Sequence, residues 1–158
     1  FTRCYGMECI GLRYFNIFGP KQNPNNPYAA VIPIFCKAFI DDLSPLINGD
    51  GETSRDFTFV ENAVQANIKA MLIPPLVKHE VMNVACGDQI TLNQMVDILQ
   101  DISFKSIKSL YGPERLGDVR HSKANISKIR NGLGYQPIIR FREGLEIVYS
   151  WYKEKYKN

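Results

Sequence analysis

The chain has 158 residues, enough for one domain or slightly more, and 45% of them are hydrophobic and 22% charged. These fractions are typical of a globular protein and exclude a disordered tail or a fibre. The 19 basic and 16 acidic residues leave a net charge of +3, which is too weak to indicate nucleic-acid binding. No apolar run approaches the roughly 18 residues that a membrane-spanning helix needs, and no signal peptide is recognisable. The first residue is Phe1 and not Met, so we expect a piece of a longer protein.

The cysteine pattern argues against a disulfide framework and against a structural zinc site. The four cysteines stand at positions 4, 9, 36 and 86, and no two of them have the C-x-x-C spacing. The two histidines, at 79 and 121, are too far apart in sequence to complete a cluster. We therefore expect buried free thiols in a reducing cytoplasm and no bound metal.

Strand and helix signals alternate along the first part of the chain. Residues 9–18 (CIGLRYFNIF) form a nearly continuous apolar run, which is typical of a strand covered on both faces. A loop rich in Pro and Asn follows at 19–27, and apolar residues spaced by three and four predict a helix over 31–40. Residues 46–48 predict a short strand that closes on the turn at 49–51.

The same alternation continues to the end of the chain. A helix is predicted over 62–73, where Pro74 and Pro75 end it, and a buried strand over 81–85. Thr91 and Gln94 have the spacing of a capping box, which begins a helix with an apolar face. The remaining expected elements are a strand at 107–111, a charged loop at 112–122, a short helix ending near Gly134, and a last helix over 142–156. This order predicts an α/β fold.

The residues offer little catalytic machinery. Tyr149 and Lys153 have the Y-x-x-x-K spacing but lie in the terminal helix beside Trp151, so helix packing is the favoured interpretation. Gly49 and Gly51 lack the third glycine of a dinucleotide-binding fingerprint and predict only a turn. No nucleophile–base pair and no phosphate-binding glycine loop can be assigned.

Isolated polar residues near strand ends and in loops are the remaining candidates. Asn16 ends a predicted strand, and ligands in open α/β sheets bind beyond the carboxyl ends of strands. Arg55 and Arg115 come from separate loops and could clamp a diphosphate, because a guanidinium offers a planar fork matched to phosphate oxygens. The alternative is that each arginine pairs with a neighbouring acid, Asp56 or Glu114.

Four segments resemble the C-terminal half of extended short-chain dehydrogenase/reductases of the NAD-dependent epimerase/dehydratase family. They are GLRYFNIFGP (11–20), INGDGETSRDFTFVEN (47–62), NVACGDQITLN (83–93) and GDVRHSKANISK (117–128). Within that family they are most similar to UDP-N-acetylglucosamine 4-epimerases. The resemblance implies a doubly wound NAD-binding domain followed by a smaller nucleotide-sugar domain.

The resemblance also implies a division of this chain. Residues 1–30 would supply the last strands of the NAD-binding domain and a connecting loop, and residues 31–158 the UDP-sugar domain, with about 55–70 returning to the first. The glycine-rich NAD loop, the catalytic Ser or Thr and the family's Y-x-x-x-K would lie upstream. No catalytic residue is therefore expected here, and NAD would be bound mainly by the other half.

The resemblance assigns roles to single positions. Tyr14 would lie beside the nicotinamide, and Asn16 would hold the diphosphate or the sugar through its amide. Leu46 and Asn48 would meet the uracil through backbone groups. The remaining expected substrate contacts are Val31 at the start of the helix that covers the substrate, Arg55 and Arg115 on the phosphates, and Asp118 on the ribose hydroxyls.

Ser122 bears on which sugar is accepted. It would occupy the slot where members that accept only unacetylated hexoses tend to carry a tyrosine, so a serine leaves room for an N-acetyl group. The alternative is that Ser122 only caps a helix.

The resemblance implies a cytoplasmic, homodimeric 4-epimerase that interconverts UDP-GlcNAc and UDP-GalNAc for surface polysaccharide synthesis, using NAD and no membrane or nucleic-acid partner. In such an enzyme the C4 hydride leaves to NAD and returns to the other face of the sugar. A UDP-glucose or UDP-glucuronate epimerase, a dehydratase, a decarboxylase and a free-standing nucleotide-binding module remain alternatives.

Overall fold

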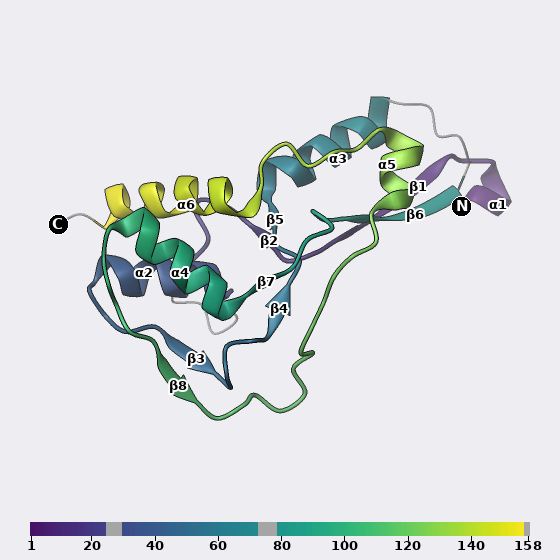
Figure 1. The fold of residues 1–158 in the computed structure, drawn as a ribbon. Coiled ribbons are helices and arrows are strands. Elements are labelled where there is room, and N and C mark those ends of the chain that lie inside the picture. Colours follow the sequence, from purple (N-terminus) through teal and green to yellow (C-terminus); the bar gives the residue numbers. More distant parts are fainter. Residues whose placement is uncertain (25–29, 73–78, 157–158) are drawn as a thin grey trace.

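The computed structural model describes residues 1–24, 30–72 and 79–156, which form a mixed α/β structure (Figure 1). The helices are α1 (Thr2–Tyr5), α2 (Val31–Ile40), α3 (Val60–Leu72), α4 (Leu92–Ser103), α5 (Ser127–Leu133) and α6 (Phe141–Lys155). The strands are β1 (Cys9–Tyr14), β2 (Ile17–Phe18), β3 (Leu46–Asn48), β4 (Ser54–Arg55), β5 (Thr58–Phe59), β6 (His79–Val84), β7 (Ile90–Thr91) and β8 (Leu110–Gly112). The α/β class expected from the sequence is confirmed.

The strands form four separate pairs. β1 pairs with β6 in parallel over six residues, β2 with β5, and β3 with β8, whereas β4 and β7 are antiparallel. In Figure 1, α2, α4 and α6 gather at one end of the molecule, and α3 and α5 lie with β1 and β6 at the other. The short β2–β5 pair lies between these two ends, where the chain passes from one group to the other.

The prediction of one continuous strand over residues 9–18 is wrong. The chain turns at Asn16, whose φ of +38° is a left-handed conformation incompatible with a regular strand. The residues before this turn pair with β6, and those after it pair with β5. Complete burial on both faces is also wrong for β1, because Gly11, Arg13 and Tyr14 are exposed in the structure.

Most of the predicted helices form within one or two residues of their expected bounds. In α4, the Thr91 hydroxyl accepts a hydrogen bond from the Gln94 N–H (3.1 Å), and the Gln94 side chain accepts one from the Thr91 N–H (2.9 Å). This confirms the capping box. The strand expected at 107–111 is shorter and later, as β8, and Pro74 and Pro75 lie outside the described residues.

All four cysteines are free, but not all are buried. Cys36 and Cys86 lie in the interior, whereas Cys9 is half-buried and Cys4 is exposed, so the expectation of buried thiols is wrong for Cys4. Within the described ranges no group of three His, Cys, Asp or Glu side chains is placed to hold a metal ion. In the same ranges, every helix is too short or too polar to cross a bilayer.

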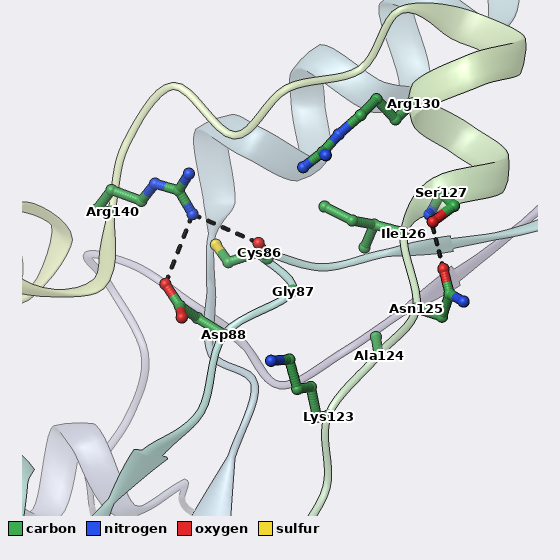
Figure 2. A pocket seen from close by; sticks show the side chains of 10 residues that line it. All are labelled: Cys86, Gly87, Asp88, Lys123, Ala124, Asn125, Ile126, Ser127, Arg130 and Arg140. Carbon is green, nitrogen blue, oxygen red and sulfur yellow. Dashed lines mark hydrogen bonds and ion pairs between the residues drawn. The ribbon is translucent and has the colours of Figure 1, made fainter.

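One apolar core lies between α3, β6 and α5. Its fully buried members include Ala66, Val84, Ile129 and Tyr135, and the Tyr135 hydroxyl donates to the Ala85 carbonyl (3.0 Å). At the C-terminal end of β6 the backbone passes close to Ile126 (Figure 2). Gly87 has φ +74° there, and a Cβ on it would lie 3.3 Å from the Ile126 side chain. Glycine therefore suits both the backbone conformation and the close approach.

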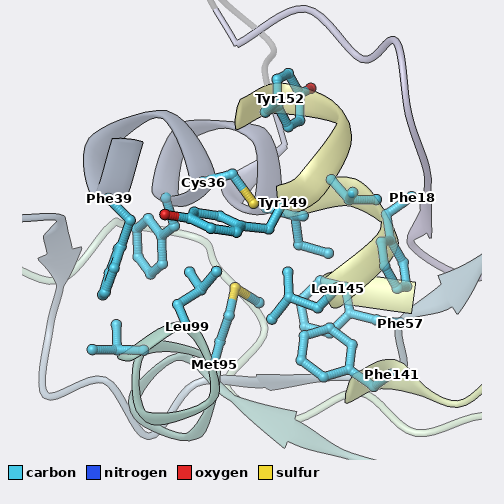
Figure 3. Packing of buried hydrophobic residues seen from close by; sticks show 14 of the residues in the cluster. Phe18, Cys36, Phe39, Phe57, Met95, Leu99, Phe141, Leu145, Tyr149 and Tyr152 are labelled. Carbon is cyan, nitrogen blue, oxygen red and sulfur yellow. The ribbon is translucent and has the colours of Figure 1, made fainter. Parts of the chain in front are cut away.

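A second, larger core fills the space between α2, α4 and α6 (Figure 3). Its side chains come from the apolar faces of these helices and from the aromatic residues of β2 and β5. Phe39, Leu99, Leu145 and Tyr152 are each 0% exposed. This core holds the three helices behind the strands that carry the candidate site.

Candidate functional site

Seven of the predicted substrate-binding residues line one cavity of about 450 Å³. They come from the β1–β2 junction, the start of α2, β3, β4 and the loop after β8. They are Asn16, Val31, Leu46, Asn48, Arg55, Arg115 and Asp118. Ser122 and Tyr14 do not line this cavity. The structure thus brings together residues that are up to 102 positions apart in sequence, from Asn16 to Asp118.

Arg55 lies at the edge of this cavity and points its guanidinium toward the loop after β8. It donates hydrogen bonds to the Asp118 carboxylate and to the Ser54 carbonyl (2.8 Å), with a longer one to the Arg120 carbonyl (3.4 Å). Its side chain is 18% exposed. The alternative pairing of Arg55 with its neighbour Asp56 is wrong.

Arg115 is the second arginine of the cavity, and it is exposed. Among the described residues its side chain has no hydrogen bond or ion pair, while its carbonyl accepts from the Asp118 N–H (3.2 Å). The neighbouring acid, Glu114, instead contacts Arg120 (3.5 Å). The alternative pairing of Arg115 with Glu114 is therefore wrong, and no other described residue neutralises the Arg115 guanidinium.

Asn16 contributes a carboxamide to the lining of this cavity. Its Nδ2 donates to the Asp56 carbonyl (3.0 Å), and its own carbonyl accepts from the Thr58 N–H (3.2 Å). An asparagine amide has two N–H donors, so a second one remains for a ligand. Asn is also one of the few residues that tolerate the left-handed backbone found at this turn.

Asp56 organises the backbone beneath the site, a role that the sequence did not reveal. Its carboxylate accepts hydrogen bonds from the backbone N–H groups of Cys86 (3.0 Å), Gly87 (3.0 Å) and Ala124 (3.2 Å). The residue is 0% exposed, and burial raises the pKa of the carboxyl above its ordinary value, against the opposite effect of the three N–H donors. A charged residue directly before the strongly apolar segment 57–60 is the sequence signal that could have drawn attention to it.

β3 forms one wall of the cavity through Leu46 and Asn48. It pairs with β8 on one side, with Leu46 opposite Leu110 and Asn48 opposite Gly112. No other described strand pairs with it, so its second edge offers backbone N–H and C=O groups. Such an edge suits recognition of a planar base by backbone groups.

The turn after β3 is fixed by glycine. Gly51 has φ +79°, and a Cβ on it would lie 2.0 Å from the Asn93 side chain. Asn93 in turn donates to the Asp50 carbonyl (3.1 Å) and to the Glu52 carboxylate (2.6 Å). This packing sets the direction in which the chain leaves β3 for Arg55.

Apolar residues that sequence reasoning missed complete the lining. They are Ile17, Phe18, Ala30, Ile32, Ile34, Phe35, Phe57 and Leu92, with the polar Thr53 beside them. Several of them, including Phe18, Phe35 and Phe57, also belong to the larger core, so no local pattern separates the cavity face from the core face.

Two predicted residues lie elsewhere. The Ser122 N–H donates to the Ser54 carbonyl (3.1 Å), one residue from Arg55. Tyr14 ends β1, is 49% exposed, and its hydroxyl donates to the Asn67 side chain on α3 (2.9 Å). The two residues are therefore neighbours of the site and not part of its lining.

The sequence matches the model of the NAD dependent epimerase/dehydratase family over residues 1–85. This match spans more than half of the chain and includes Asn16 and Arg55. The chain belongs to this family. Its α/β arrangement is accordingly part of the Rossmann-like fold of these enzymes.

Solved structures agree in fold over nearly the whole chain. A UDP-N-acetylglucosamine 4-epimerase from Methanobrevibacter ruminantium, solved with UDP-N-acetylmuramic acid, is 40% identical with a TM-score of 0.89. A UDP-glucose 4-epimerase from Thermotoga maritima, solved with UDP-glucose, is 33% identical with a TM-score of 0.91. The matched region includes 98% of this chain in the first comparison and 99% in the second, but only 49% of each solved chain.

One curated relative catalyses a reaction other than epimerisation. The UDP-N-acetyl-alpha-D-glucosaminuronate decarboxylase of Bacillus cytotoxicus is 29% identical over 164 residues, covering 97% of this chain and 50% of that protein. The chain thus spans about half the length of the relatives it matches. Epimerases and a decarboxylase both occur among them.

Proposed function

We propose that residues 1–158 form the substrate-binding part of an NAD-dependent 4-epimerase that acts on UDP-N-acetylhexosamines. The observation that carries this proposal is the convergence of Arg55, Arg115 and Asn16 on one cavity, in a chain that belongs to the epimerase/dehydratase family. Two guanidinium groups and a carboxamide give the positive charge and the donors that a diphosphate requires.

Each side chain has a distinct proposed task. Arg115, which has no partner among the described residues, would bind the diphosphate directly, and Arg55 would bind it while remaining close to Asp118. Asp118 would accept hydrogen bonds from the ribose hydroxyls with its second oxygen. The free edge of β3 at Leu46 and Asn48 would meet the uracil, and Val31 would begin the helix over the substrate.

This arrangement concentrates binding energy on the nucleotide. A 4-epimerase must present both faces of the sugar ring to the same reactive group, so the sugar must turn while the nucleotide stays bound. Fixing the diphosphate by charge leaves the hexose unrestrained. The apolar side chains of Phe35, Phe57 and Leu92 add surface without adding donors that would hold the sugar in one orientation.

NAD would supply the hydride acceptor and donor of this chemistry. The sequence has no G-x-G-x-x-G between a strand and a helix, so these residues fit only the nicotinamide end of the cofactor. Tyr14, exposed at the carboxyl end of a parallel strand, is where that end would be held. We propose that the remainder of the cofactor binds elsewhere in the protein.

The most specific part of the proposal is the preference for an N-acetylated sugar. It rests on the small side chain of Ser122 and is supported by 40% identity to a UDP-N-acetylglucosamine 4-epimerase. Because Ser122 is hydrogen-bonded next to Arg55 and does not line the cavity, it would act at the rim. Ser122→Tyr should lower turnover of UDP-GlcNAc more than turnover of UDP-glucose, and equal losses would remove Ser122 from the proposal.

The proposal is tested with the product of the complete coding sequence. Incubation with NAD and UDP-GlcNAc should yield UDP-GalNAc, detected by the changed C4 proton coupling in NMR. The similarity to a decarboxylase favours one second candidate, which would release carbon dioxide from a UDP-hexuronate. Carbon dioxide release from an added UDP-hexuronate, with no epimerisation of UDP-GlcNAc, would replace the first proposal by the second.

A further inference from the structure

A second hollow, of about 680 Å³, opens at the carboxyl end of β6 (Figure 2). Its floor is the segment Cys86–Asp88, which begins two residues after β6 ends at Val84, and its far wall is the start of α5. None of its lining residues belongs to the cavity that contains Arg55 and Arg115. It is therefore a separate feature, and no task in the proposed function uses it.

The floor of this hollow is held in place from below. The buried Asp56 carboxylate accepts the N–H groups of Cys86, Gly87 and Ala124, which belong to two different segments of the lining. A Cβ added to Gly87 would lie 3.3 Å from the Ile126 side chain, so the backbone passes close to Ile126 at this point. A floor fixed by three hydrogen bonds from a buried carboxylate is a preformed surface, so a ligand would not have to order it.

Cationic side chains surround the hollow on three sides. Figure 2 shows Lys123, Arg130 and Arg140 extending toward the space between them from the loop before α5, from α5 and from the loop before α6. Arg140 is oriented by the Cys86 carbonyl (3.4 Å) and by the Asp88 carboxylate (3.6 Å). The side chains of Lys123 and Arg130 have no hydrogen bond or ion pair within the described part of the chain.

The balance of charge in the hollow is positive. Its lining side chains are three cations and one carboxylate, Asp88, and the Asp56 carboxylate beneath the floor lowers the formal net charge from +2 to +1. The Asp88 carboxylate is already engaged by Arg140, whose guanidinium has five N–H donors and keeps others free. The two remaining cations, Lys123 and Arg130, are unneutralised by any described neighbour.

We infer that this hollow is an anion-binding site for a small, multiply charged oxyanion of the phosphate or diphosphate class. Two planar guanidinium forks and one ammonium match phosphate oxygens, and the carboxyl end of a parallel strand is a common place for such a ligand. A diphosphate, which can reach the groups on opposite sides, should bind more tightly than a single phosphate. Because the site is open to solvent, binding should weaken with salt.

The test is a calorimetric titration of the complete gene product with inorganic pyrophosphate while saturating UDP and NAD occupy the first cavity and the proposed cofactor site. Wild-type protein should show one binding event, weakened about tenfold or more when two charged contacts are removed in Lys123→Gln/Arg130→Gln. Both side chains are exposed, so this variant should keep the wild-type unfolding midpoint. Lys128→Gln is the matched control, because Lys128 lies on the same helix and contacts Glu80 (2.5 Å) outside the hollow.

Binding that is lost in the double variant and kept in Lys128→Gln supports the site. No binding event in wild type, or equal weakening in all variants as diffuse charge would give, overturns it. If UDP does not bind at all, the proposed function fails, and the same comparison of variants without UDP still decides the second site.

Discussion

The guanidinium of Arg55 donates a hydrogen bond to the carboxylate of Asp118, although 63 positions separate the two residues. This contact joins β4 to the loop after β8 and so closes one side of the cavity. The Asp118 side chain is 47% exposed, so solvent screens the pair. Its main effect is to hold Arg55 toward the same space that Arg115 faces.

A double-mutant cycle measures this link. Arg55→Ala, Asp118→Ala and the double variant should show a coupling of about 0.2–1 kcal/mol in the free energy of unfolding, as is usual for exposed pairs. The coupling should fall at high salt, since exposed charges are screened. Urea denaturation at two salt concentrations provides the measurement, and strictly additive losses at low salt would contradict the contact.

Asp56 should matter more for stability than either arginine. Asp56→Asn replaces one acceptor oxygen by a donor, leaving a buried backbone N–H without its partner, which costs about 1–3 kcal/mol of unfolding free energy. Asp88→Asn is the control, because the Asp88 side chain is 65% exposed and its ion pair with Arg140 is worth about 1 kcal/mol or less. Equal losses in the two variants, measured by urea denaturation, would remove the organising role of Asp56.

At position 144 of α6, glycine should be more stable than alanine, although alanine usually stabilises a helix. A Cβ at this position of α6 would lie 2.8 Å from the Phe59 ring and 2.9 Å from the Phe18 ring. We expect Gly144→Ala to lower the free energy of unfolding by about 1–3 kcal/mol through overpacking, despite the better helix propensity of alanine.

The control for Gly144 is Ser150→Ala on the exposed face of the same helix, which should leave stability unchanged or slightly higher. Chemical denaturation of both variants checks the pair. A stabilised Gly144→Ala would show that α6 does not pack against the aromatic cluster as described.

The buried thiols should be protected in the folded protein. Burial raises the pKa of Cys36 to about 12, and burial followed by the nearby Asp56 charge raises the pKa of Cys86 to about 11. At pH 8 both should resist iodoacetamide in native protein and react in urea, which peptide mass spectrometry can follow. Rapid native labelling of either would contradict its burial.

The same shifts give a pH dependence. The ordinary thiol pKa is 9.0, so the folded state keeps these protons when the unfolded chain has begun to lose them. The free energy of unfolding should therefore fall as pH rises above about 9, because the unfolded state then binds fewer protons. Replacing both cysteines by alanine should flatten this part of the stability curve.

Helices α2, α4 and α6 could be predicted from the sequence because the spacing of their apolar residues is local, and α4 also begins with a capping box. The break at Asn16 could not, since the residues on its two sides have similar composition and differ only in their strand partners, β6 and β5. The position of β8 is likewise fixed by its register with β3, 64 residues earlier at Leu46 and Leu110. Long-range pairing decides such boundaries.

For the candidate site too, the residue types could be predicted from the sequence, but the long-range contacts could not. Residue chemistry and the family resemblance pointed to Asn16, Arg55 and Arg115, which indeed share a cavity. The partner of Arg55 could not be predicted, because its nearest acid in sequence, Asp56, turns to the buried backbone and leaves the distant Asp118 to make the contact. Neighbouring residues of an extended segment point to opposite sides, so an acid next to an arginine in sequence is often not its partner in space.

UDP binding by Arg115→Ala, measured by calorimetry on the complete gene product, tests the central claim most directly. Arg115 has no other described partner, so its removal should weaken binding by about 1.5–3 kcal/mol, the usual contribution of a charged hydrogen bond. Arg142→Ala, which removes an arginine outside the cavity on α6, should leave the affinity unchanged. Unchanged UDP affinity in Arg115→Ala, or no UDP binding by the wild type, would contradict the account.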